Sequence, residues 1–122
     1  MNCVFCDIAN VDSKDQVLVN YEDLSVVVFE PLNPCITGHR LFVPTTHVKN
    51  VTDLTPNGSV MSDIFEAIRR YTESNNIKDY NVIINNGELA DQTVFHLHVH
   101  LIPRTEAKSV SMPWSYQWFI PK

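Results

Sequence analysis

Three histidines stand in strict alternation near the end of the sequence, His96, His98 and His100. In a β-strand every second side chain lies on the same face, so a strand here would present three imidazoles on one side. Imidazole acts as a nucleophile, a proton donor or acceptor, and a metal ligand near neutral pH. Three interpretations are open: a solvated strand face, one metal ion held by all three rings, or three rings with divided roles.

A single metal ion bound by all three histidines would be strained. In an extended strand the backbones of His96 and His100 lie about 13 Å apart. Zinc holds its nitrogen ligands at about 2.0–2.1 Å. The alternation therefore favours divided roles, with one imidazole as nucleophile, one as proton donor and one used elsewhere.

The second candidate site is the pair Cys3-x-x-Cys6. Two cysteines at this spacing indicate redox chemistry or a metal site. No βαβ pattern surrounds the pair, which argues against a thioredoxin-like role. Two thiolates together with two imidazoles would form a closed, tetrahedral and structural zinc site. The remaining cysteine, Cys35, has no partner in the sequence, and we interpret it as an inert loop residue.

Five runs of β-branched and aromatic residues and one helical pattern must position these groups. The predicted strands cover residues 17–21, 25–30, 39–44, 81–85 and 94–102. A helix is predicted over 56–74, with Thr55 as its N-cap and a proline at its first position. Six apolar residues recur on one face of that helix, namely Val60, Met61, Ile64, Phe65, Ile68 and Tyr71. This order predicts an α+β fold, a five-stranded antiparallel sheet with one long helix.

The composition limits the classes of protein that remain. The chain has 122 residues, no repeat and no linker, which predicts one domain over 1–122 with a cysteine-bearing segment at 1–10 and an aromatic tail at 105–122. With 44% apolar and 19% charged residues it is not a disordered chain. A net charge of −5 without a basic run argues against nucleic-acid binding. With no apolar run of about 18 residues and no signal peptide, we expect a cytoplasmic protein without a membrane partner.

The sequence resembles the histidine triad superfamily. The run HLHVHLI at 96–102 is similar to the signature of that superfamily. Three longer blocks, at 3–8, 33–47 and 85–104, resemble its small purine-nucleotide-binding branch in their order and spacing. They read CVFCDI, NPCITGHRLFVPTTH and NNGELADQTVFHLHVHLIPR, and the resemblance covers nearly the whole chain.

The resemblance implies a nucleotide hydrolase or nucleotidyl transferase that acts on purine nucleoside 5′-phosphate derivatives, phosphoramidates in particular. His98 would attack the α-phosphorus and form a nucleotidyl-histidine that water then hydrolyses. A backbone carbonyl near Gly87 would hold its other ring nitrogen. His100 would hydrogen-bond the phosphate and act as general acid for the leaving group. The alternatives are a dinucleoside polyphosphate hydrolase and a zinc-stabilised nucleotide-binding or scaffolding module without activity.

Further nucleotide-binding residues follow from the same resemblance. Asn85, Gln92 and Thr93 would contact phosphate oxygens, and His39 would support the triad. The residues that would sandwich the purine are Val4, Phe5, Ile8, Phe29 and Leu32. Two positions depart from the pattern of many relatives. Pro31 stands where an Asp or Asn binds the ribose hydroxyls, and Asp91 stands where a glycine precedes Gln92.

The resemblance also assigns a structural zinc ion and a partner. Zinc would be held by Cys3, Cys6, His47 and His96, which leaves His98 and His100 for chemistry. Relatives of this size form homodimers in which the two sheets are joined, and their C-terminal tail reaches the partner. We therefore expect a homodimer with tail aromatics at its interface, namely Trp114, Tyr116, Trp118 and Phe119.

Overall fold

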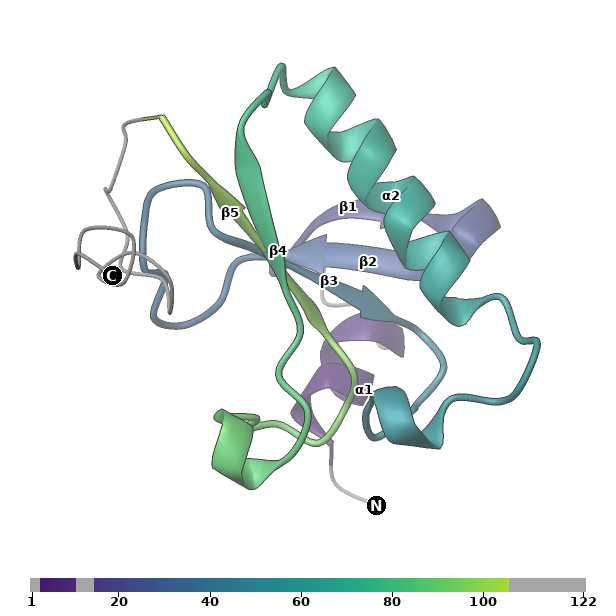
Figure 1. Ribbon diagram of the computed structural model, residues 1–122. Coiled ribbons are helices and arrows are strands. Elements are labelled where there is room, and N and C mark those ends of the chain that lie inside the picture. The colour runs from purple at the N-terminus through teal and green to yellow at the C-terminus, as the bar shows by residue number, and fades with distance from the viewer. Residues whose placement is uncertain (1–2, 11–14, 106–122) are drawn as a thin grey trace, which may run out of the picture.

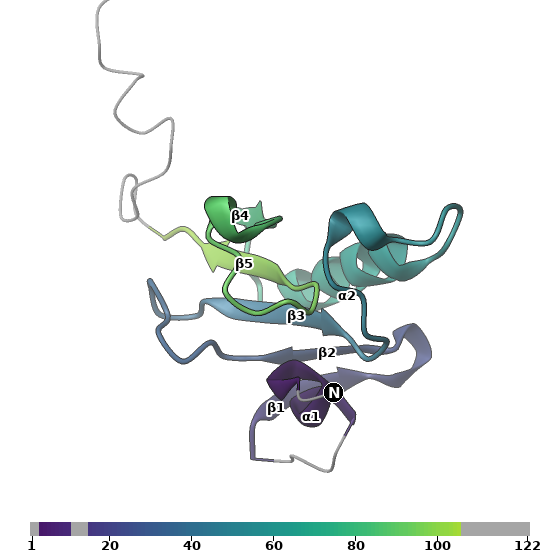
Figure 2. The same cartoon turned by 90° about the horizontal axis from the view of Figure 1, so that it is seen from below.

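The computed structural model describes residues 3–10 and 15–105 of the chain. Five strands form one antiparallel sheet in the order β1-β2-β3-β5-β4, which can be followed in Figures 1 and 2. They are β1 (Val17–Tyr21), β2 (Val26–Phe29), β3 (Arg40–Pro44), β4 (Tyr80–Ile83) and β5 (Val99–Pro103). The helices are α1 (Val4–Asn10) and α2 (Val60–Ser74). The α+β fold with its five-stranded antiparallel sheet is confirmed.

Short 3₁₀ turns connect several of these elements, at Glu22–Leu24, Val51–Asp53 and Glu88–Ala90. Within the described residues, no helix combines the length and the apolar character that crossing a membrane requires.

The sheet has an apolar cluster on each of its faces because side chains alternate along the strands. Val26 and Val28 of β2 pack into the cluster under α2, while Val27 packs with α1 on the other side. The larger cluster consists of Val26, Val28, Phe42, Ile64, Ala67, Ile68, Tyr71, Leu97, Val99 and Leu101. The smaller one consists of Phe5, Val27, Phe29, Leu41 and Val43. Both faces of the central strands are therefore covered.

Helix α2 begins later than predicted. Residues 55–58 form a turn, closed by a hydrogen bond of 3.1 Å from the Gly58 amide to the Thr55 carbonyl. Asn57 adopts a left-handed backbone conformation with φ of 62°, which asparagine tolerates and which interrupts a helix. The expectation of a helix from residue 56 with Thr55 as N-cap is wrong, since Ser59 takes the N-cap position.

The last strand is also shorter than predicted. A strand over 94–102 was expected, but β5 starts at Val99, and residues 94–98 form an irregular segment. The cause is a hydrogen bond of 2.6 Å from the Leu97 amide to the Val48 carbonyl, outside the sheet. Only His100 of the three alternating histidines therefore lies in a strand.

Helix α1 was not predicted, although Cys3 and Cys6 have helical i, i+3 spacing. Phe5 and Ile8 have the same spacing and face the smaller apolar cluster. This periodicity in residues 3–8 is the signal that could have revealed the helix.

Candidate active site and metal centre

His98 directly precedes β5, and one of its ring nitrogens is held by the backbone. Its Nδ1 is 2.8 Å from the carbonyl oxygen of His96. A carbonyl oxygen only accepts, so Nδ1 carries the proton and Nε2 keeps its lone pair. The side chain is 7% exposed. Burial lowers the pKa of His98 below the usual histidine range, and the hydrogen bond to the His96 carbonyl partly offsets this. The ring is therefore neutral near pH 7, and its Nε2 has the lone pair that a nucleophile requires.

The expectation that a carbonyl near Gly87 holds His98 is wrong. The Gly87 carbonyl instead accepts hydrogen bonds from the amides of Ala90, at 3.1 Å, and Gln92, at 3.0 Å. These bonds close the turn around Glu88–Ala90. The ring of His98 takes the nearest carbonyl of its own irregular segment instead, two residues back in the chain.

His100 and His39 form a pair of imidazoles beside His98. His39 Nε2 lies 2.9 Å from His100 Nδ1, and the His98 and His100 ring centroids are 5.1 Å apart. Burial, and then His98 and His39, lower the pKa of His100 to about 4. Burial and the neighbouring Arg40 also lower the pKa of His39. Both rings are therefore neutral near pH 7.

One atom of this group has no partner within the described residues. His100 Nε2 is buried and makes no hydrogen bond there. A buried polar atom left unpaired costs about 1–3 kcal/mol, so such atoms point to a ligand or to solvent. Together with His98, this atom marks the position where a polar substrate group can be bound.

The loop before the histidines contains the residues expected to bind phosphate, and it uses one of them differently. The Gln92 side chain is 3% exposed. Its oxygen accepts from the Gly87 amide at 2.8 Å, and its nitrogen donates to the carbonyls of Lys49 at 2.8 Å and Val94 at 3.1 Å. The expected contact of Gln92 with phosphate therefore does not fit, because its amide holds the loop together.

The side chains of Asn85 and Thr93, also expected to bind phosphate, make no hydrogen bond within the part of the chain that the structure describes. Asn85 is half-buried and Thr93 is exposed. Thr93 lines a cavity of about 580 Å³ between residues 93–95 and the start of α1. Asp91 is exposed and has φ of 67°, a left-handed conformation that favours glycine and that aspartate tolerates.

The apolar residues expected around the purine do not form one group. Phe5 contacts the His98 ring edge to face, with 5.0 Å between the ring centroids. Phe29 packs behind it at 5.3 Å. Leu32 is 98% exposed and contributes nothing to this packing. The structure therefore brings Phe5, His98, His100 and His39 together and leaves Leu32 outside.

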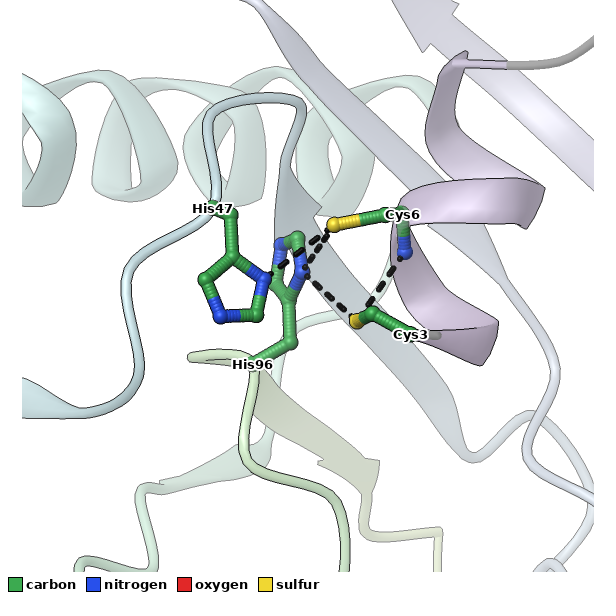
Figure 3. A group of neighbouring side chains, drawn as sticks. All are labelled: Cys3, Cys6, His47 and His96. Carbon is green, nitrogen blue, oxygen red and sulfur yellow. Dashed lines mark hydrogen bonds between the residues drawn. The ribbon is translucent and has the colours of Figure 1, made fainter. Parts of the chain in front are cut away.

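Four further side chains converge in a second group, to which the first turn of the chain contributes two cysteines (Figure 3). The ligand atoms of Cys3, Cys6, His47 and His96 all lie within 4.8 Å of one another. Cys6 Sγ is 3.1 Å from His47 Nδ1 and 3.4 Å from His96 Nδ1, and Cys3 Sγ is 3.5 Å from His96 Nδ1. Adjacent sulfur and nitrogen ligands of a tetrahedral zinc ion would be about 3.6 Å apart. This cluster could bind a metal ion.

Local structure explains how these four residues meet. The amide of Cys6 donates to Cys3 Sγ at 3.3 Å, so the first turn of α1 directs both sulfurs to one side. His47 follows β3, and His96 precedes β5. His96 Nε2 donates to the Pro44 carbonyl at 2.8 Å, which leaves Nδ1 as the metal-binding atom. Burial and the adjacent Cys3 raise the pKa of the Cys6 thiol, so a cation is what would stabilise two thiolates here.

The comparison with known proteins agrees with this geometry. A family model described as HIT domain matches residues 12–107. The chain belongs to the HIT domain family. A histidine triad protein from Clostridium difficile has the same fold, with a TM-score of 0.80 and 31% identity over 91% of this chain and 97% of that one.

Two further members of the HIT domain family bear on the sites. The adenosine 5′-monophosphoramidase hnt1 of Schizosaccharomyces pombe is 30% identical over 93% of this chain and 84% of its own length. A zinc-bound histidine triad family protein from Mycobacterium smegmatis has a TM-score of 0.73 and 30% identity, covering 96% of this chain and 87% of that one. In this chain the Cys/His cluster (Cys3, Cys6, His47 and His96) lies beside the imidazoles of His98, His100 and His39. The hydrogen bond from His98 Nδ1 to the His96 carbonyl connects the two groups.

Proposed function

We propose that the protein hydrolyses purine nucleoside 5′-phosphate derivatives, phosphoramidates in particular, through a nucleotidyl-His98 intermediate. The observation that carries this proposal is the hydrogen bond from His98 Nδ1 to the His96 carbonyl at 2.8 Å. It leaves a neutral Nε2 with its lone pair beside the ring of His100, whose Nε2 has no hydrogen-bond partner among the described residues. The relative from Schizosaccharomyces pombe, an adenosine 5′-monophosphoramidase by name, supports the substrate class.

The reaction has two displacements at phosphorus. In the first, the His98 Nε2 lone pair forms a bond to the α-phosphorus while the bond from phosphorus to the leaving nitrogen breaks. The leaving amine takes up one proton. In the second, water attacks the same phosphorus, the bond from His98 to phosphorus breaks, and the attacking water releases one proton. The nucleotide and the amine are the products, and His98 returns to its neutral form.

His100 stabilises the departing group in this scheme. Because its pKa is about 4 in the free protein, the ring is neutral near pH 7 and offers Nε2–H as a hydrogen-bond donor. A donor that is already in place for the charge developing on the leaving atom lowers the barrier without reorganisation. The proton that the leaving amine takes up comes from solvent, which differs from the general-acid role of His100 that the resemblance implies, because a ring with a pKa of about 4 carries no extra proton near pH 7. Asn85 and Thr93 remain the proposed contacts to the phosphate oxygens, and Phe5 and Phe29 the proposed purine contacts.

We propose zinc as the ion of the Cys/His cluster, with a structural role. Two sulfur and two nitrogen donors are the set that tetrahedral zinc prefers, and the relative from Mycobacterium smegmatis is zinc-bound. Cys3, Cys6, His47 and His96 would fill all four positions, so no site remains for water or substrate. The ion would hold α1 against the segment that carries His98.

We also propose a homodimer joined through β4. This strand lies at the edge of the sheet, with β5 as its only neighbour among the described strands. An exposed strand edge carries unpaired backbone groups that a second copy can satisfy. Tyr80 at the start of β4 is exposed, in keeping with a surface that a partner would cover. The aromatic tail expected at this interface lies outside the described residues.

A turnover panel tests the proposed activity. Adenosine and guanosine phosphoramidates, diadenosine polyphosphates and nucleotide sugars would be compared by kcat/KM, and intact-mass spectrometry would follow the protein during turnover. We expect the phosphoramidates to give the highest values and the protein to gain the mass of one nucleotidyl group. A preference for diadenosine polyphosphates would support the alternative hydrolase. Nucleotide binding without any turnover would support a binding or scaffolding module.

A further inference from the structure

The loop before β3 folds back onto the imidazole of His39. The Cys35 amide donates to His39 Nδ1 at 3.1 Å, and the His39 amide donates to the Ile36 carbonyl at 3.1 Å. Gly38, between them, has φ of 90°, as the third residue of such a turn requires. A Cβ at Gly38 would lie 3.2 Å from Pro103 Cγ, so the turn also packs closely on β5. The Cys35 amide is therefore directed at the His39 ring by a turn that itself packs on β5.

This amide fixes which nitrogen of His39 carries the proton. A neutral imidazole has one N–H, and a nitrogen that accepts a hydrogen bond has none. Because His39 Nδ1 accepts from the Cys35 amide, its proton is on Nε2. Burial and the adjacent Arg40 lower the pKa of His39, so the ring is neutral near pH 7 and carries a single N–H.

The same count then fixes His100. His39 Nε2–H faces His100 Nδ1 at 2.9 Å, so His100 Nδ1 accepts. The one proton of His100 must be on Nε2, the buried atom without a partner in the described part of the chain. In the reverse arrangement His100 Nδ1–H would donate to His39 Nε2. The proton of His39 would then lie on Nδ1, where it would face the N–H of Cys35, donor against donor. A His39 ring without any proton would be an anion, so neither form fits the observed contacts.

We propose that the Cys35 backbone amide is a positioning group that makes His100 a hydrogen-bond donor toward bound substrate. It acts through His39, and without it the pair could adopt the opposite tautomers. His100 Nε2 would then present a lone pair, which repels an anionic phosphate oxygen or a leaving atom that gains negative charge. The proposal rests on the proposed function for the identity of the substrate, but its tautomers are a property of the free protein.

Nitrogen NMR of the protein labelled with ¹⁵N at histidine tests the proposal, because protonated and unprotonated ring nitrogens have separate shifts. We expect His39 and His100 both to be protonated at Nε2 in the wild type. Cys35→Ala keeps the amide and should keep these tautomers. Cys35→Pro removes the amide, and because one proton lies between His39 Nε2 and His100 Nδ1, we expect both rings to become mixtures of the two tautomers.

The dependence of kcat on the leaving group is a second measurement, and it would not change if the Cys35 amide only stabilised the fold. In Cys35→Pro, kcat for a phosphoramidate with a basic amine should fall about tenfold more than kcat for a nucleotide ester of nitrophenol, because donors matter most for poor leaving groups. If Cys35→Pro does not fold, His39→Gln and His39→Leu replace it. Only the glutamine can still donate to His100 Nδ1, so only His39→Gln should keep the His100 tautomer.

The proposal is overturned if wild-type His39 is protonated at Nδ1. It is equally overturned if Cys35→Pro, or in its place His39→Leu, keeps the wild-type tautomer of His100. A protein with the expected tautomers but without turnover would contradict the proposed function and leave the positioning of His100 intact.

Discussion

The Nδ1 atom of His98 lies 2.8 Å from the backbone carbonyl oxygen of His96, so a residue of the Cys/His cluster sets the tautomer of the candidate nucleophile. His96 is itself fixed by a second backbone contact, from its Nε2 to the Pro44 carbonyl at 2.8 Å. The two sites of the molecule are therefore connected by one peptide carbonyl and one imidazole, and not only by proximity.

Replacing His98 tests covalent catalysis. His98→Ala removes the neutral imidazole whose ring lies beside that of His100, so we expect kcat to fall by at least about 1,000-fold. Nucleotide affinity, measured by calorimetry, should change only slightly, because Asn85 and Thr93 remain. The nucleotidyl adduct seen by mass spectrometry should disappear. Activity near that of the wild type would show that another group attacks phosphorus.

Replacing His100 tests the donor at the leaving group. His100→Ala removes the Nε2–H that faces the proposed substrate position, and we expect about a 100-fold loss for phosphoramidates with basic amines. Esters of nitrophenol, whose leaving group is stable as an anion, should lose much less. The measurement is kcat across a series of leaving groups. Equal losses along the whole series would contradict a role at the leaving atom.

The residue types of both sites could be predicted from the sequence, because imidazoles and thiols in regular spacing are conspicuous. The apolar stripe of α2 was also predictable: Ile64, Ile68 and Tyr71 are buried as expected. Phe65, assigned to the same face, is 48% exposed, because the stripe that the sheet covers is narrower than the sequence pattern.

The contacts that set the chemistry could not be predicted. The His96 carbonyl, the Pro44 carbonyl and the Cys35 amide are main-chain groups, which every residue type possesses. The bond from the Leu97 amide to the Val48 carbonyl, which ends β5 early, joins segments far apart in sequence. No residue pattern encodes such bonds, and they appear only once the strands are paired.

Acid should destabilise the protein partly through His100. Its pKa is about 4 in the folded protein, under the influence of burial, His98 and His39, against an ordinary value of 6.5. Since the unfolded chain binds the proton more tightly, stability is full above about pH 6.5 and falls as the pH drops toward 4. The loss from this group is at most about 3 kcal/mol.

Comparison of two proteins isolates that contribution. His100→Gln cannot titrate, so its free energy of unfolding, measured with denaturant from pH 7 to pH 4, should fall less steeply than that of the wild type. Protonation of the Cys/His cluster affects both proteins alike and cancels in the difference. Parallel curves would contradict the lowered pKa of His100.

The proposed homodimer predicts a definite mass. Light scattering at micromolar concentration should give about twice the chain mass of 14.0 kDa. Truncation after Pro113 removes Trp114 and Trp118, and we expect it to weaken the dimer or to alter the substrate profile. A mass near 14.0 kDa for the full chain would exclude the dimer. A truncated protein with unchanged mass and unchanged substrates would show that the tail has neither role.

Removing one ligand of the Cys/His cluster should lower both the zinc content and the melting temperature of the protein. We expect elemental analysis of the freshly purified protein to find one zinc per chain. Cys3→Ser should lose the ion, because the serine oxygen is a poor replacement for a thiolate, and its melting temperature should fall by about 10 °C or more. Cys35→Ser is the matched control, since Cys35 is exposed and lies outside the cluster, and it should retain both the zinc and the melting temperature.

Because the His96 carbonyl holds His98, metal loss should also broaden the NMR signal of His98 Nδ1–H, which a purely remote structural ion would leave sharp. Protein purified without chelators that contains no zinc would contradict the assignment.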